Sequence, residues 1–214
     1  MSEVFGPIIG SYDVEQAVVA VLEEWLPTYL AEVARVRGID QSKVPRPRSV
    51  FQTKEFEGWP EDRLPSVQVV SPGLAERPER APEGYTAWWQ INVFCVVHGR
   101  DRAATRRLRG IYEDAIPACL MQRPSLGGLA TGMQWLGGGA GDVPIDERDT
   151  RTLAGAVAVM AVQVDSVLDP TLGPAQPDPL PAAGGSNAKT LDGLPAYPDD
   201  PTATTVDATV VPRA

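Results

Sequence analysis

The amino-acid sequence predicts an α+β fold: a sheet of about four mostly antiparallel strands, with two helices on one face. The strongest observation is a two-residue alternation from Tyr85 to Val97, where every odd-numbered residue is apolar. Apolar stripes at helical spacing precede and follow this segment, and further strand patterns give the order helix, strand, strand, helix, strand, strand. That order favours helices packed on one face of a single sheet.

The first helix is predicted to begin at Asp13 and to stop at Gly38. Asp13 is expected to cap the helix, with Gln16 three residues later as its partner in a capping box. Pro27 is expected to bend the helix near residues 23–25, because proline removes one helical hydrogen bond. The apolar stripe expected to face the sheet consists of Val14, Ala17, Val18, Val21, Leu22, Trp25, Tyr29 and Val33.

Two strands are predicted between the helices, and they are expected to pair as a wide hairpin. The first covers residues 66–70 and ends at the turn signal Ser71-Pro72-Gly73, and the second is the alternating segment. The proline-rich residues 39–65 are expected to form a loop that holds a short strand at 49–53. Residues 74–83 carry two prolines and alternating charges, which predicts an exposed loop.

The second helix is predicted to follow Gly99, with Asp101 as its cap, because a carboxylate there can accept from the N–H groups of the first turn. Pro117 is expected to kink this helix or to end its regular part. The apolar stripe is Ala104, Leu108, Ile111, Tyr112, Ala115 and Cys119. The opposite face is predicted to carry Arg102, Arg106 and Arg109.

Two more strands are predicted at residues 130–136 and 153–167, joined by a glycine- and acid-rich loop at 137–150. The composition changes at Asp169, which divides the chain into an α+β domain, residues 1–168, and an extended arm, residues 169–214. The arm holds nine of the 21 prolines, six Asp, two basic residues and one aromatic residue. Such a segment is too poor in apolar side chains to build a core of its own.

The charge of the chain bears on its partners. Its 28 acidic and 19 basic residues give a net charge of −9, which argues against general nucleic-acid binding. The sequence contains no run of about 18 apolar residues, so no membrane span is predicted. The first residues lack the basic start and apolar core of a signal peptide, so the chain is expected to be made in a cytoplasm.

The glycine-rich stretch does not match a nucleotide-binding motif. Residues 137–141 are followed by Asp142 and Val143, whereas a phosphate loop ends in Gly-Lys-Ser or Gly-Lys-Thr. A dinucleotide fingerprint needs a helix after the glycines, and a strand is predicted here. The acidic residues of the same region lack the spacing of an EF-hand calcium loop.

No catalytic constellation is visible either. His98 is the only histidine, so no site with several histidine ligands can form. Cys95 and Cys119 lie on predicted apolar faces and are expected to be buried thiols. The chain is therefore expected to be no enzyme and to bind no cofactor or metal.

Two groups of residues are candidates for contacts between subunits. The first pairs the arginine face of the second helix with the acidic loop, because opposite charges give register to repeated contacts. Its residues are Arg102, Arg106 and Arg109 on one side and Asp142, Asp146, Glu147 and Asp149 on the other. The second is a weak extended pattern in the arm that could add to a sheet edge, at Val206, Val210 and Val211. For the arginines and the acidic loop, the alternative is solvent-exposed surfaces without a partner.

The order of several short motifs resembles the tail terminator proteins of long-tailed bacteriophages. The resemblance covers about three quarters of the chain, from the first predicted helix to Val167, and it rests on packing and turn residues in a fixed order. The motifs are Arg63-Leu64-Pro65-Ser66-Val67-Gln68-Val69, Trp88–Val97, Asp101 with Ala104 and Tyr112, Pro124-Ser125-Leu126-Gly127-Gly128, Gln134-Trp135-Leu136-Gly137 and Arg151-Thr152-Leu153-Ala154-Gly155.

The resemblance implies a structural virion protein, assembled in the host cytoplasm. Such proteins form a ring, usually of six subunits, on the head-proximal end of the tail tube. Implied partners are further copies of the chain, the tail tube protein and the head–tail connector proteins, with genome DNA passing through the lumen. An acidic surface suits that passage, since a basic lumen would hold DNA. The alternatives are a head–tail connector or completion protein and, in another class, a small ligand-binding domain or enzyme.

Overall fold

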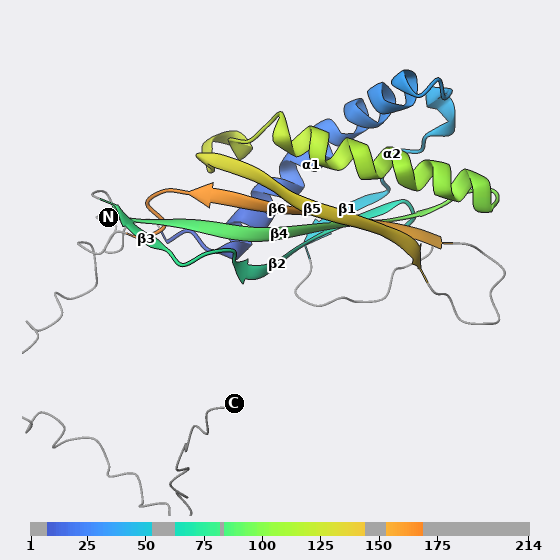
Figure 1. Ribbon diagram of the computed structural model, residues 1–214. Helices are drawn as coiled ribbons and strands as arrows, with labels where there is room; N and C mark the ends of the chain where they lie inside the picture. Colours follow the sequence, from blue (N-terminus) through green and yellow to red (C-terminus); the bar gives the residue numbers. More distant parts are fainter. Residues whose placement is uncertain (1–7, 53–62, 82–83, 144–152, 169–214) are drawn as a thin grey trace, which may run out of the picture. The chain divides into compact units, whose positions relative to one another are not determined.

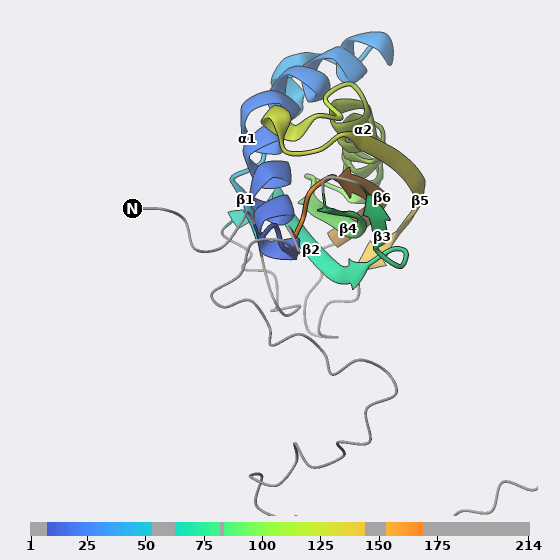
Figure 2. The same cartoon turned by 90° about the vertical axis from the view of Figure 1, so that its left-hand side faces the viewer.

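A computed structural model describes residues 8–52, 63–81, 84–143 and 153–168 of the chain. Within these residues, two α-helices and six strands build an α+β fold. Both helices lie on the same side of the sheet in the two perpendicular views of Figures 1 and 2. The fold class and the placement of the helices agree with the prediction, but the sheet has six strands where about four were expected. The arm, residues 169–214, lies outside the described residues.

The sheet is mixed rather than wholly antiparallel. Its strands follow the spatial order β1 (Ser49–Gln52), β2 (Ser66–Leu74), β4 (Gly84–His98), β6 (Leu153–Val164) and β5 (Gly132–Val143). The short strand β3 (Glu79–Ala81) pairs with the start of β4, within the stretch expected to be an exposed loop. All neighbours are antiparallel except β1, which was predicted as a strand and pairs in parallel with β2.

The long central strand β4 forms as its alternation predicts. Its odd-numbered residues face the helices, and Ala87, Ile91, Val93, Cys95 and Val97 are all at most 1% exposed. The predicted hairpin pairing of β2 with β4 is also present, in antiparallel register. On its other side β4 pairs continuously with β6 from Ala87 to His98.

Strand β2 does not end at the turn signal. It runs on to Leu74 through a β-bulge between Val70 and Gly73, where Gly73 adopts a φ of 130°. The hydroxyl of Ser71 donates to the carbonyl of Gln90 on β4 at 2.8 Å. A bulge absorbs the proline and the glycine without breaking the pairing, which is why the turn signal was misleading.

Helix α1 (Ser11–Val36) begins two residues earlier than predicted. Gly10 is its N-cap, and the backbone N–H of Gly10 donates to the carboxylate of Asp13 at 2.8 Å. Asp13 therefore stands at the third helical position and serves as the reciprocal partner of the cap, a role assigned to Gln16 in the prediction. The helix continues through Pro27 without interruption.

The buried stripe of α1 is rotated relative to the predicted one. The residues at its centre recur every four positions and are at most 2% exposed: Val14, Val18, Leu22, Leu26, Leu30 and Ala34. Ala17, Val21, Trp25, Tyr29 and Val33 are only partly buried and flank this line. The prediction favoured the large aromatic residues, whereas the helix packs its aliphatic line against the sheet.

Glu15 is a buried charged residue that the sequence did not reveal. Its side chain is 8% exposed, and one carboxylate oxygen accepts from the backbone N–H of Ser71 at 2.7 Å. The other carboxylate oxygen accepts from the side-chain amide of Gln52 at 3.3 Å. The carboxylate thus joins α1 to β1 and to the bulge of β2.

Helix α2 (Arg102–Met121) begins as predicted. The carboxylate of Asp101 accepts from the backbone N–H of Ala104 at 2.8 Å. The helix continues past Pro117 to Met121, so this proline does not end it. Buried alanines of β6 belong to the same core as this helix. Tyr112 of the helix is fully buried, and its hydroxyl donates to the carbonyl of Pro45 at 2.9 Å.

The glycine-rich stretch is a strand and not the predicted loop. Gly137 to Gly141 belong to β5 and pair with β6 from Val159 to Gly155. A β-bulge between Trp135 and Gly137 shifts the register, and Gly137 has a φ of 146°, which favours glycine. A Cβ on Gly138 would lie 2.6 Å from the Val157 carbonyl oxygen, so this position also requires glycine.

Replacing Glu15 with alanine tests its structural role. Glu15→Ala should lower the free energy of unfolding by about 1–3 kcal/mol, because the N–H of Ser71 loses its acceptor in a partly buried place. Urea denaturation followed by circular dichroism measures the change. The exposed Glu23 is the matched control, and Glu23→Ala should change stability by no more than about 0.5 kcal/mol. Equal losses for the two variants would contradict the role given to Glu15.

Candidate assembly interfaces

The arginine-rich end of α2 is held close to the sheet. A Cβ on Gly99 would lie 2.6 Å from the backbone nitrogen of Thr105, so glycine permits the tight passage from β4 into the helix. The hydroxyl of Thr105 accepts from the N–H of Gly99 at 3.0 Å and donates to the Asp101 carbonyl at 2.8 Å. This end of the helix is therefore fixed in direction by β4.

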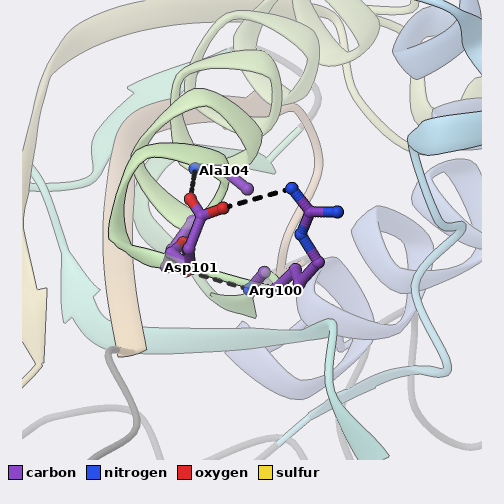
Figure 3. A network of polar contacts seen from close by, with 5 residues as sticks. Arg100, Asp101 and Ala104 are labelled. Atoms are coloured by element: carbon purple, nitrogen blue, oxygen red, sulfur yellow. Dashed lines mark hydrogen bonds and ion pairs between the residues drawn. The ribbon is translucent and has the colours of Figure 1, made fainter.

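The charged side chains of Arg100 and Asp101 lie at the start of α2, as Figure 3 shows. The hydrogen bond from Ala104 lowers the pKa of the Asp101 carboxyl, and the charge of Arg100 adds to this effect. The guanidinium of Arg100 lies 3.7 Å from Asp101, and its side chain is 93% exposed. The carboxylate thus stays ionised where the positive end of the helix dipole favours it.

Two of the three predicted arginines lie on the exposed face of α2. Arg102 and Arg106 are exposed, whereas Arg109 is half-buried. Arg109 stands between Thr105 and Tyr112, which belong to the buried stripe, so it borders the core instead of facing solvent fully. The prediction of one common face therefore holds for Arg102 and Arg106 and is only partly right for Arg109.

The acidic residues proposed to meet the arginine face fall mostly outside the described residues. Asp142 belongs to the end of β5, where its backbone pairs with Ala154 of β6. Asp146, Glu147 and Asp149 lie outside the described residues, as do Val206, Val210 and Val211. The pairing of these acidic residues with the arginine face stays a prediction.

Strand β5 offers a surface that sequence reasoning missed. Among the described strands it pairs only with β6, so it is an edge of the sheet, and it is 12 residues long. Trp135 and Leu136 beside its bulge are 57% and 52% exposed. Long edge strands with exposed apolar side chains are rare in isolated proteins because they pair with other chains. In the sequence, the segment Gln134-Trp135-Leu136-Gly137 marks this surface, but the strand predicted there ends at residue 136, whereas β5 continues to Val143.

The glycines of β5 point to the same surface. Gly139 and Gly141 have room for a Cβ among the described residues, since the nearest atom to Gly139 is a Val157 methyl group at 3.8 Å and Gly141 has none within 4 Å. The packing of the described residues therefore does not explain why both lack a side chain. Glycine within a strand often marks the close approach of another backbone.

Two cysteines and a histidine are further reactive groups among the described residues. Cys95 and Cys119 are buried and free of disulfides, as predicted. Burial raises the pKa of the Cys95 thiol to about 12 and that of Cys119 to about 11, so neither is a thiolate nucleophile near neutral pH. His98 is exposed at the end of β4. Within the described ranges, no three His, Cys, Asp or Glu side chains are placed to hold a metal ion.

A pocket of about 540 Å³ lies beside α1. Trp25 and Tyr29 of α1, Arg46 of the following loop and Arg123 after α2 contribute to its lining. The guanidinium of Arg123 stacks on the indole of Trp25, 3.2 Å from the ring centroid. The hydroxyl of Tyr29 donates to the side-chain oxygen of Gln122 at 2.8 Å, which holds the Tyr29 ring of this lining in place.

Comparison with known proteins finds a distant likeness to solved structures. No protein-family model matches the sequence, and no curated protein matches it. A chain of the solved structure described as "Virion of native gene transfer agent (GTA) particle" is similar, with 13% identity over 71% of this chain and 93% of that chain. Its TM-score of 0.39 is too low for any conclusion about function to rest on it. Neither described helix is long and apolar enough to cross a membrane.

Reversing the charge of the exposed arginines tests their part in assembly. We expect Arg102→Glu combined with Arg106→Glu to raise the dissociation constant between subunits at least tenfold at low salt, since like charges would then face each other. Sedimentation velocity at several protein concentrations measures this constant.

The matched control is Arg77→Glu combined with Arg80→Glu, which reverses two exposed charges before β4 and should leave assembly unchanged. Circular dichroism should be the same for all variants. Adding Asp142→Arg to the α2 double variant should restore part of the lost affinity. Unchanged association of the α2 variant would exclude this face as a contact.

Proposed function

We propose that the chain is a structural virion protein that forms a ring, of six subunits by the resemblance, at the head-proximal end of a phage tail tube. There it would end tube polymerisation and join tail to head. The ordered motifs described above support this proposal, because the resemblance they carry extends over most of the α+β domain. The observation that carries it in the structure is the exposed edge strand β5.

An edge of this kind favours a repeating contact. The outer backbone groups of β5 find no partner strand among the described residues, and a second copy can supply one. The contact would be heterologous: β5 of one subunit would meet a different surface of the next, and such contacts close into rings when the rotation permits. Beside this strand pairing, the arginine face of α2 is the candidate for an ionic contact with the next subunit, since Asp142 lies at the end of β5.

The motif residues occupy positions where the backbone is constrained. Gly127 and Gly128, after α2, have φ values of 72° and 99°, and Gly137 at the bulge of β5 has 146°. These values explain why glycine recurs there, because other residues rarely adopt them. The motifs are therefore a signature of this backbone path, and their role in a tail terminator is an inference from the resemblance.

The charge of the chain suits a ring around DNA. With a net charge of −9, the chain as a whole repels a polyanion, so DNA could pass a lumen without being held. The proposed partners are further copies of the chain, the tail tube protein and a head–tail connector protein. We also propose that the arm, residues 169–214, reaches adjacent subunits, with Val206, Val210 and Val211 as candidates for pairing with a sheet edge.

A lysine on the edge strand tests the ring directly. Leu136→Lys should leave the subunit folded, because Leu136 is already half exposed, and should abolish ring formation, because a charge at the edge opposes strand pairing. Size-exclusion chromatography and negative-stain images of wild type should show rings, and those of the variant monomers.

Leu74→Lys is the matched control, since Leu74 is 44% exposed and stands at the end of β2. It should form rings like wild type. Wild-type rings should also sit at one end of tubes made from the tail tube protein and stop their growth. A wild-type chain that stays monomeric with tube protein present would contradict the proposed function. Rings that bind a connector protein but not tubes would assign it to the head side of the joint.

A further inference from the structure

The pocket beside α1 combines apolar and cationic side chains. Trp25, Pro27 and Tyr29 give its lining an apolar part. Arg46 and Arg123 add two positive charges to the same lining. Flat aromatic surfaces are the usual recognition surface for proline-rich segments, and guanidinium groups bind carboxylates.

The guanidinium of Arg123 is oriented for a further partner. Its central carbon lies over the Trp25 ring, 3.2 Å from the centroid, and a cation–π contact of this kind leaves guanidinium N–H groups able to bind an acceptor. Its Nε is buried and has no hydrogen-bond partner among the described residues. A buried donor without an acceptor is unfavourable, so a ligand that brings an oxygen to this guanidinium would be favoured.

The acidic residue of the pocket does not cancel this preference. Glu32 accepts from Arg35 at 2.9 Å through Nε and at 2.5 Å through Nη2, so its charge is already paired. The hydrogen bond from Arg35 also lowers the pKa of the Glu32 carboxyl. With Glu32 paired to Arg35, the charges of Arg46 and Arg123 make the pocket cationic.

We propose that this pocket binds the acidic, proline-rich arm of a second copy of the chain. Residues 195–201, Pro-Ala-Tyr-Pro-Asp-Asp-Pro, join three prolines and a tyrosine to two adjacent carboxylates, which is the chemistry that the pocket complements. Proline and tyrosine pack on Pro27 and Tyr29, because Arg123 already covers one face of Trp25, and the aspartates meet Arg46 and Arg123. The 46 residues of the arm can reach about 150 Å when extended, enough to cross a neighbouring subunit.

This inference rests on the proposed ring, since it needs copies side by side, and it adds a link between neighbours that is independent of β5. Binding of an extended proline-containing segment costs less conformational entropy than binding of a flexible one. The arm would therefore tie each subunit to the next without a core of its own.

Photo-crosslinking between copies tests the proposal in the full-length chain. Tyr197 is replaced by the photo-crosslinking residue p-benzoylphenylalanine in one preparation, and the other preparation carries heavy isotopes. After mixing, assembly and illumination, mass spectrometry should find light arms joined to heavy peptides that contain residues 25–32, 46 or 123. Crosslinks to other surfaces, or only within one copy, would overturn the proposal.

Charge reversal in the pocket sharpens the test. Arg46→Glu combined with Arg123→Glu should reduce these crosslinks at least fivefold, whereas Arg77→Glu, outside the pocket, should not. A labelled peptide of residues 193–203 should bind the chain in fluorescence anisotropy, and its Asp199→Asn, Asp200→Asn form should bind at least tenfold more weakly. Equal binding of a proline-free acidic peptide would show a general anion site and contradict the inference.

The two proposals fail separately. If the chain stays monomeric but binds the peptide in the pocket, the ring fails and the pocket assignment stands. If rings form, yet the peptide does not bind and no crosslink reaches the pocket, the arm assignment fails and the ring stands.

Discussion

The continuous pairing of β4 with its neighbours is the constraint on which the rest of the structure depends. β4 pairs with β6 from Ala87 to His98 and with β2 on its other side, so it fixes the register of the central strands. Its odd-numbered residues form the floor on which α1 and α2 pack. A register shift by one residue would place this apolar line on the opposite face and remove the core. The close passage at Gly99 then carries the direction of β4 into α2.

The parts of the fold that follow from local chemistry were predictable. The alternation of β4 and the Asp101 cap of α2 each depend on residues close in sequence. The centre of the α1 stripe was not predictable in the same way, because Leu26 and Leu30 compete with Trp25 and Tyr29 for the same helix face. Packing against α2 and the sheet decides between them, and it buries the aliphatic line. The buried carboxylate of Glu15 needs partners on two distant strands, which no local pattern reveals.

The candidate surfaces were predictable only in part. Arg102 and Arg106 are exposed as expected, since they stand opposite the apolar residues of α2. The glycines of β5 led to the prediction of a loop, because glycine has a low propensity for strands. In the structure, pairing with β6 holds them in an extended conformation. Because β5 is an edge strand, the exposed Trp135 and Leu136 are candidates for contact with another chain, which the sequence alone did not indicate. The apolar edge of β5 and the basic face of α2 are therefore the two candidate contacts of the proposed ring, one by strand pairing and one by charge.

Hydrogen exchange of the β5 amides tests the ring most directly. Mass spectrometry would compare peptides covering Gly132–Val143 in the dilute monomer and in the assembled protein, with the buried β4 peptides as the reference. We predict that exchange of the β5 peptides slows at least tenfold on assembly, because their outer N–H groups acquire partners, while β4 stays protected in both states. Equal exchange of β5 in the two states would contradict an assembly built on this edge.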